Sequence, residues 1–144
     1  MKAVILENEN KEKIIEHFIA YGIEDFIIFG KSIEEDYYRL NGVDVLTLSS
    51  LKNDSIKEKL LKIKGSLKGR FFLVYSDAII NFDIDEIIKQ HLSRQVCTTL
   101  VEKDSKLCAL LLENEIFDYL SCFASLENEA LKRMAQDGEM LIYK

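Results

Sequence analysis

The sequence predicts a single α/β domain with a mixed sheet. Short apolar runs alternate with amphipathic segments through the first half of the chain, which indicates parallel strands joined by helical crossovers. The second half adds a hairpin and two consecutive helices, which indicates at least one antiparallel strand. The chain has 144 residues and no repeat, linker or low-complexity segment, so we expect residues 1–144 to form one domain.

The first half of the chain contains three predicted strands and two helices. The strands are Lys2–Leu6, Asp25–Phe29 and Val43–Leu48; the helices are Lys11–Tyr21 and a segment that ends with Tyr38 to Leu40. Ile14, Ile15 and Phe18 have helical spacing. Gly22 is suited to the left-handed backbone conformation that ends a helix. Asn8 or Asn10 is the expected cap of the first helix. Ser32 caps the second, with Glu35 in capping-box position.

The rest of the chain begins with a basic helix. It starts near Asp54, the expected cap, and carries most of its lysines within Lys57 to Arg70. The later elements are a strand over Phe71–Tyr75, a helix over Ile84–Leu92 capped by Asp83, strands over Val96–Val101 and Leu107–Leu112, a helix marked by Ile116 to Phe123, a helix over Leu126–Gln136 and a strand over Met140–Tyr143. The polar segment Glu102 to Lys106 is suited to a hairpin turn between its two strands.

Composition excludes several classes of function. A net charge of −6 argues against general binding of nucleic acid. The basic segment Lys57 to Arg70 has the apolar spacing of a solvated helix face, and a phosphate-binding or acidic-partner face is the alternative. No apolar run is long enough to cross a membrane, and Met1 to Leu6 is too short for a signal-peptide core, so we expect a cytoplasmic protein. Cys97, Cys108 and Cys122 lie in apolar contexts and are predicted to be buried free thiols.

Asp77 is the principal candidate for chemistry. It follows the apolar run Phe71–Tyr75, so its carboxylate is expected at the carboxyl end of a buried strand, where open α/β sheets bind ligands. Asp83 and Asp85 lie nearby in the sequence, and carboxylates with water suit Mg²⁺. The alternative is that Asp83 is a helix cap and Asp85 a first-turn residue favoured by the helix dipole.

Other catalytic patterns are missing. Glu7-Asn8-Glu9 stands where a dinucleotide-binding domain carries GxGxxG, and these carboxylates repel phosphate. Ser76 lacks the flanking glycines of a nucleophile elbow. His17 and His91 have no cysteine or acidic residue at ligand spacing. The residues alone therefore predict a Rossmann-like domain with one aspartate, Asp77, at a position where such domains bind ligands.

Several segments resemble the sugar-1-phosphate nucleotidyltransferases, especially the glucose-1-phosphate cytidylyltransferase branch. The opening MKAVILENE is similar to that family's MKAVILAGG, and YGIEDFIIFG, from Tyr21 to Gly30, is similar to HGIKDFIICCGY. FLVYSDAIINFDI, from Phe72 to Ile84, resembles FLFTYGDGVADLDI, and EALKRMAQDGEMLIY, from Glu129 to Tyr143, resembles EPLMTLAQQGELMAF. The segments cover nearly the whole chain in the family's order.

The resemblance implies a GT-A-like three-layer sandwich and makes Asp77 the counterpart of the family's first metal-binding aspartate. The departures are large. The glycine-rich loop with GTRL is replaced by a few polar residues after Leu6, and a chain without proline cannot contain the family's KP pair. Ser76 and Ala78 replace the glycines that flank the aspartate. The sugar-binding EKP and NGG segments are missing, and the sequence stops at Lys144, before the family's second metal-binding aspartate.

These losses lead us to expect a domain that keeps the fold and lacks the reaction. One phosphate-stabilising donor is worth about 2.7–4 kcal/mol of barrier lowering, and several are missing. The first hypothesis is a non-catalytic domain that binds a protein partner, a second copy of itself, or a nucleotide or sugar phosphate through Ser76, Asp77 and Lys31. The alternatives are a minimal nucleotidyltransferase that uses Mg²⁺ with Asp77 and Asp83, and an oligomerisation module that uses Tyr37, Tyr38 or Phe123.

Overall fold

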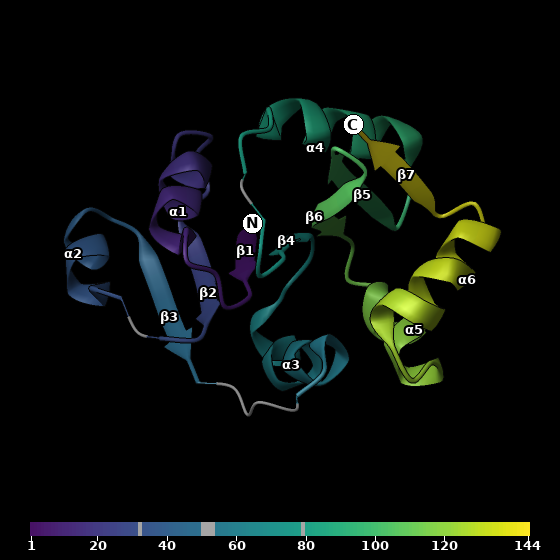
Figure 1. The fold of residues 1–144 in the computed structure, drawn as a ribbon, viewed down its shortest axis with the longest axis horizontal. Coiled ribbons are helices and arrows are strands. Elements are labelled where there is room, and N and C mark those ends of the chain that lie inside the picture. The colour runs from purple at the N-terminus through teal and green to yellow at the C-terminus, as the bar shows by residue number, and fades with distance from the viewer. Residues whose placement is uncertain (32, 50–53, 79) are drawn as a thin grey trace.

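A seven-stranded mixed sheet forms the centre of the molecule (Figure 1). The computed structural model describes residues 1–31, 33–49, 54–78 and 80–144. The strands are β1 (Lys2–Ile5), β2 (Asp25–Phe29), β3 (Asp44–Leu48), β4 (Phe71–Val74), β5 (Thr98–Lys103), β6 (Lys106–Leu112) and β7 (Met140–Tyr143), in the order β3-β2-β1-β4-β6-β5-β7. β6 is antiparallel to β4 and β5, and the other neighbours are parallel. The predicted mixed sheet is therefore confirmed.

Helices cover both faces of the sheet and complete three layers. One face packs against α1 (Lys11–Ile19), α2 (Glu35–Leu40) and α4 (Ile84–Arg94). The other packs against α3 (Ile56–Ile63), α5 (Ile116–Cys122), the π-helical segment Leu126–Ala130 and α6 (Leu131–Gln136); a 3₁₀ turn, Lys64–Ser66, extends α3. This arrangement confirms the predicted α/β three-layer sandwich.

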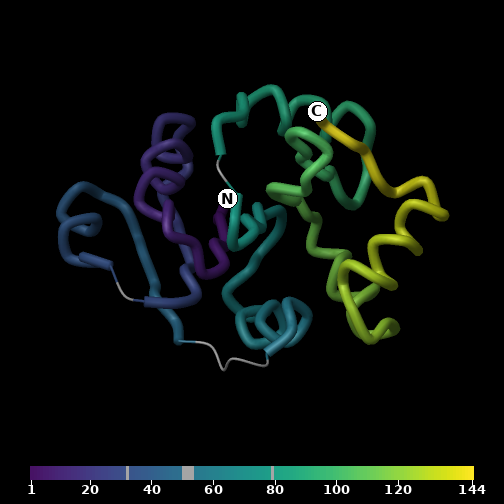
Figure 2. The backbone as a smooth tube through the Cα atoms, viewed as in Figure 1, coloured from purple at the N-terminus to yellow at the C-terminus, as the bar shows by residue number. Residues whose placement is uncertain are grey.

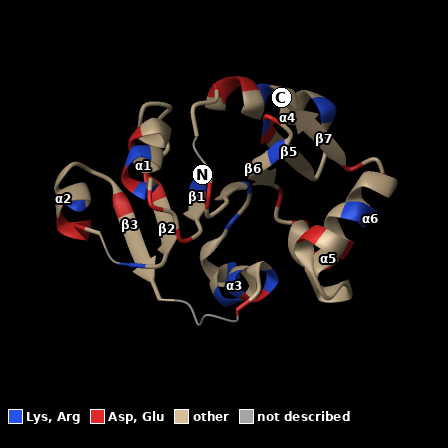
Figure 3. Ribbon diagram, viewed as in Figure 1, with Lys and Arg blue, Asp and Glu red and all other residues tan. Residues whose placement is uncertain are grey.

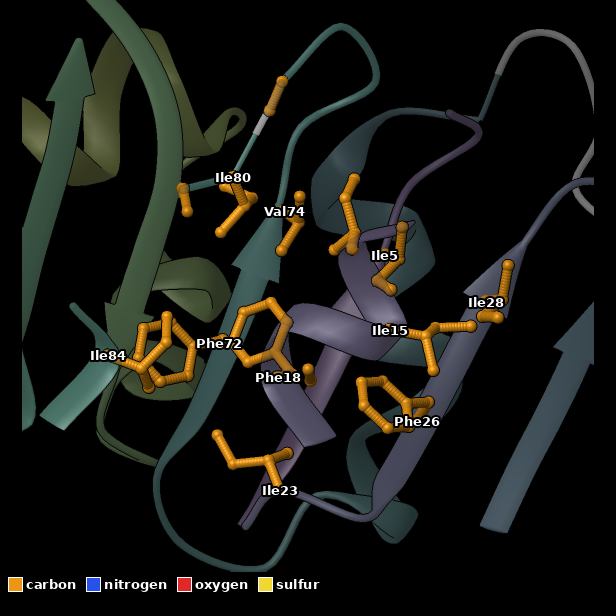
Figure 4. Packing of buried hydrophobic residues seen from close by; sticks show 14 of the residues in the cluster. Ile5, Ile15, Phe18, Ile23, Phe26, Ile28, Phe72, Val74, Ile80 and Ile84 are labelled. Atoms are coloured by element: carbon orange, nitrogen blue, oxygen red, sulfur yellow. The ribbon is translucent and has the colours of Figure 1, made fainter. Parts of the chain in front are cut away.

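The alternation of side chains along the strands explains the two cores. In β4, Phe72 and Val74 point to the face of α1, whereas Phe71 and Leu73 point to the opposite face. Phe18 of α1 lies over the first face, with its ring 5.2 Å from that of Phe72 (Figure 4). Because both faces are covered, β4 is apolar and buried at all of its positions, as the sequence predicted.

Several local predictions need correction. Ser55, and not Asp54, caps α3: its hydroxyl accepts the Glu58 N–H at 3.1 Å. Asp54 pairs instead with Lys62, in the last turn of the helix. The continuous helix expected over residues 126–136 is a π-helical turn followed by α6. The proposed cap Ser32 lies outside the described residues.

The three cysteines are free, as expected, but they are not all buried. Cys97 and Cys108 are buried, whereas Cys122 is exposed at the last residue of α5. The apolar stripe of that helix is formed by Ile116, Phe117 and Leu120, so Cys122 faces water and the prediction for it was wrong. Separately, no helix in the described ranges is long and apolar enough to cross a membrane.

Candidate functional site

The sheet changes its winding direction between β1 and β4. The chain starts at β1, runs outward through β2 to β3, and then returns to β4 on the other side of β1 (Figure 2). Ligands of open α/β sheets bind at such a switch point, beyond the carboxyl ends of the strands. The relevant segments here are residues 6–10 after β1 and 75–78 after β4, and we call the space between them the switch-point crevice.

Asn8 spans this crevice. Its side-chain amide donates to the carbonyl oxygens of Tyr75 and Ala78, both at 3.0 Å, and its Oδ1 accepts the Asn10 N–H at 2.7 Å. The residue is 5% exposed. Asn10 is the N-cap of α1 but makes no cap bond with its side chain. The prediction of Asn8 as a helix cap thus missed its role, which is to join the loop after β1 to the loop after β4.

Asp77 lies beside the crevice with its carboxylate in solvent. Its side chain is 69% exposed, and Oδ2 lies 2.8 Å from Nζ of Lys106 at the start of β6. The hydrogen bond and the charge of that lysine hold the pKa of Asp77 below its ordinary value. The position at the carboxyl end of β4 agrees with the sequence-based expectation, and the lysine partner was not foreseen.

The remaining predicted site residues do not gather around Asp77 in a metal-binding arrangement. Ser76 is exposed, and Asp83 caps α4 by accepting the Glu86 N–H at 3.1 Å, which confirms its structural role. Lys31 is exposed, and its carbonyl oxygen accepts a 2.6 Å hydrogen bond from Lys11 Nζ. In the described part of the chain, no three His, Cys, Asp or Glu side chains are placed to hold a metal ion. Roles for Asp77 and Asp83 in binding Mg²⁺ remain predictions.

The loop after β1 also packs closely on the end of β2. Gly30 follows β2 with φ of +126°, and a Cβ built there would lie 3.1 Å from Cγ of Glu7. Glycine permits both this backbone conformation and this approach. The loop after β1 therefore touches the ends of β2 and β4 on its two sides.

Two solved structures share this fold. The inositol-1-phosphate CTP transferase from T. maritima matches with a TM-score of 0.63 at 11% identity, over 99% of this chain and 84% of that one. A protein described as a nucleotide-diphospho-sugar transferase from Desulfovibrio desulfuricans G20 matches with a TM-score of 0.52 at 9% identity, over 99% and 79%. The fold is like that of these two transferases. No family model matches the sequence, and no curated protein does, so the likeness concerns the fold alone.

The basic segment begins on α3, where Figure 3 shows several Lys positions in blue. Its side chains take part in packing. Lys57 Nζ donates to the carbonyl of Phe123 at 2.8 Å, and Lys59 and Lys64 lie over the rings of Phe29 and Phe117. These contacts attach the helix to its surroundings, and they favour the interpretation of a structural helix face over that of a phosphate-binding surface.

A cleft of about 740 Å³ opens at the opposite, amino edge of the parallel strands. Its wall includes Arg70 before β4, His91 of α4 and Glu113 after β6. Glu113 accepts two hydrogen bonds from Arg70, at 2.5 and 3.1 Å, and a third contact joins it to His91 Nε2 at 2.7 Å. His91 Nδ1 lies 2.7 Å from Thr99 Oγ1. We call this set the Arg70–Glu113–His91 network.

The network is partly desolvated, and both ring nitrogens of His91 and both carboxylate oxygens of Glu113 have partners. Burial lowers the pKa of His91, which is 1% exposed, and outweighs the opposing effect of Glu113. Burial raises the pKa of Glu113, but the hydrogen bonds from Arg70 and His91 outweigh it and hold the pKa below its ordinary value. No acidic partner for His91 was predicted from sequence spacing, because Glu113 is 22 residues away. The arrangement joins α4, β5 and β6 to the start of β4.

Proposed function

We propose that this chain is a nucleotidyltransferase-like domain that acts by binding and does not transfer nucleotides. The observation that carries the proposal is the position of Asn8. Its amide fills the switch-point crevice and bonds both walls, at Tyr75 and Ala78. A nucleotide phosphate at this point would have to displace a buried side chain that already has its hydrogen-bond partners.

The charges beside the crevice support the same proposal. Phosphoryl transfer depends on cations and metal ions that neutralise the phosphates in the transition state. Here Glu7 and Glu9 are exposed on the loop after β1, and the Lys106 ammonium is paired with Asp77. The aspartate that the resemblance to the nucleotidyltransferases makes a metal ligand is thus paired with a lysine in this chain, which supports the proposal.

Release of pyrophosphate tests the absence of transfer. The protein is incubated with CTP or UTP, Mg²⁺ and a sugar 1-phosphate or inositol 1-phosphate, and we expect no release above the protein-free rate. Release that Asp77→Asn abolishes would refute the proposal, whether or not Asp83→Asn also abolishes it. Asp83→Asn tells whether such an activity needs the second carboxylate, because Asp83 is exposed and its structural role is to cap α4.

A minimal Mg²⁺-dependent nucleotidyltransferase is the second candidate. The exposure of Asp77 favours it, because an ion pair between half-exposed side chains is weak and a divalent cation could replace Lys106. A rise in melting temperature with nucleotide plus Mg²⁺, larger in Lys106→Ala, would support this candidate. A flat response in both proteins would count against it.

The proposed binding partner is a protein, either another chain or a second copy, and the proposed location is the cytoplasm. Of the aromatic residues considered for an interface, Tyr37 is 59% exposed, whereas Tyr38 is 7% exposed. Phe123 is half-buried beside α3. Tyr38 was therefore a wrong choice, because it packs into the core beneath α2.

A further inference from the structure

A groove of about 600 Å³ lies between α1 and α2, which cover the same face of the sheet (Figure 1). Acidic, aromatic and aliphatic side chains line it: Glu12 and Glu16 of α1, Ile33 and Glu34 before α2, and Tyr37 and Tyr38 of α2. We call it the α1–α2 groove. Its size is that of a small-ligand site, and none of these residues belongs to the switch-point crevice.

The hydroxyl of Tyr38 has no partner in the groove. The residue is 7% exposed, because its ring packs into the core. Its oxygen makes no hydrogen bond with any described residue, and it opens onto the groove instead of being enclosed by the core. Since buried polar groups are normally hydrogen-bonded, this oxygen is available to a polar group of a ligand.

Three carboxylates surround this hydroxyl. Burial raises the pKa of Tyr38, and the negative charges of Glu12, Glu16 and Glu34 raise it further, which places these charges near the phenol oxygen. All three glutamates are exposed, and none forms an ion pair within the described residues. Arg39 of α2 is engaged by two other carboxylates of its own helix. The groove is therefore negatively charged and suits a cation.

The arrangement favours an organic cation over a metal ion. Within the described ranges, no three His, Cys, Asp or Glu side chains are placed to hold a metal together. The ring of Tyr37 is 59% exposed and stands at 80° to that of Tyr38, with the ring centroids 5.3 Å apart. Aromatic rings attract ammonium groups through their negative faces, and Ile33 offers apolar surface to a methylene chain.

We propose that the α1–α2 groove binds an alkylammonium group. The Tyr38 oxygen accepts a hydrogen bond from the ammonium, the Tyr37 ring contacts its methylene carbons, and the carboxylates of the groove balance its charge. A free diamine or polyamine offers this group, and so does a lysine side chain of another protein. The inference goes beyond the proposed function, because it names a second site that does not depend on the absence of nucleotidyl transfer.

Titration with cadaverine, followed by amide NMR shifts, tests the site. In about 0.15 M salt we expect a saturable shift of the signals of Glu34 to Tyr38, and no shift with 1,5-pentanediol, which has the same chain without charge. Tyr38→Phe should weaken binding about tenfold, because only the hydroxyl is lost. Tyr21→Phe is the control, since Tyr21 lies outside the groove, and it should bind like the wild type. Circular dichroism confirms that each variant folds.

A pair of charge variants separates the groove from general attraction to a protein of net charge −6. Glu16→Gln should weaken binding several-fold, whereas Glu24→Gln should not. The two are matched, because both remove one exposed carboxylate and only Glu16 lines the groove. Absence of binding, or an equal effect of the two variants, overturns the inference.

Two further probes distinguish the sources of the ammonium group. Nα-acetyl-lysinamide presents it as a protein does, and spermidine presents it as a free polyamine does. Binding of the lysine derivative as tightly as cadaverine supports the site with a protein lysine as its ligand; binding of cadaverine and spermidine alone supports it with a free polyamine. A chain that releases no pyrophosphate and binds no amine refutes only this inference. One that releases pyrophosphate and binds the amine refutes only the proposed absence of transfer.

Discussion

The side-chain amide of Asn8 donates a 3.0 Å hydrogen bond to the carbonyl oxygen of Tyr75, 67 residues later in the chain. A second bond reaches Ala78, and the buried amide thereby closes the point at which open α/β sheets bind ligands. The residue that fills this space is uncharged and satisfies groups on both loops. The closure is therefore part of the folded structure and contributes to its stability.

Replacing Asn8 by alanine should reduce the free energy of unfolding by about 2–3 kcal/mol, because the carbonyls of Tyr75 and Ala78 lose their partner in a buried place. Urea denaturation measures the change. Asn10→Ala is the matched control: its side chain makes no cap bond, so we expect a change of a few tenths of a kcal/mol. Equal effects of the two substitutions would show that the bonds from Asn8 contribute little.

Gly30→Ala should destabilise the protein by about 1–3 kcal/mol, because an L-residue is strained at φ of +126° and its Cβ would lie 3.1 Å from Glu7 Cγ. Gly22→Ala is the control. It also has a positive φ, of +84°, but nothing lies within 4 Å of the added Cβ, so we expect a loss of about 1 kcal/mol. Thermal unfolding compares the two. A larger loss for Gly22→Ala would contradict the role of the contact with Glu7.

The elements that sequence predicts well are those whose signals are local. The run Asp25–Phe29 is buried on both faces and gave the bounds of β2 without error. Asp83 was expected as a cap and is one. Where two neighbouring residues could both cap, local chemistry was insufficient. Ser55 caps α3 in place of Asp54 because the acidic side chain reaches Lys62 instead.

The candidate site was predictable only in its position. Asp77 lies at the carboxyl end of β4 because an apolar strand precedes it, and this could be inferred from the chain alone. Its partner Lys106 is brought beside it by the antiparallel pairing of β4 with β6. The pairing of Arg70 with Glu113, 43 residues apart, depends on the same two strands. Contacts of this kind require the sheet order, which no local pattern encodes.

Thiol reagents should distinguish Cys122 from the other two cysteines. In the native protein we expect labelling at Cys122 alone, because Cys97 and Cys108 are buried. Burial also raises the pKa of Cys97 to about 12 and raises that of Cys108, so neither is a reactive thiolate near neutral pH. Mass spectrometry locates the label. The Cys122→Ser variant should remain unlabelled when it is native, and it should react at Cys97 and Cys108 when it is unfolded in urea. Rapid labelling of the native variant would contradict the buried placement of Cys97 and Cys108.

The Arg70–Glu113–His91 network should make the protein less stable in acid. Burial holds the pKa of His91 below its ordinary 6.5, so the unfolded chain binds a proton more readily than the folded protein does. The stability from neutral His91 is therefore present above pH 6.5 and is lost as the pH falls through the lower pKa of the folded state. Glu113 acts in the same direction at lower pH: its stabilisation is present above 4.5 and is lost as its own lowered pKa is crossed.

Unfolding in urea at a series of pH values separates this effect from others. His91→Gln should cost about 1–3 kcal/mol near neutral pH, because Glu113 and Thr99 lose a buried partner, and should flatten the fall in stability that begins as the pH drops below 6.5. His17→Gln is the control, since His17 contacts the Phe82 carbonyl and lies outside the network. Its pH dependence in this range should match that of the wild type. If the loss of stability in acid persists in His91→Gln and disappears in His17→Gln, the acid sensitivity belongs to α1 instead.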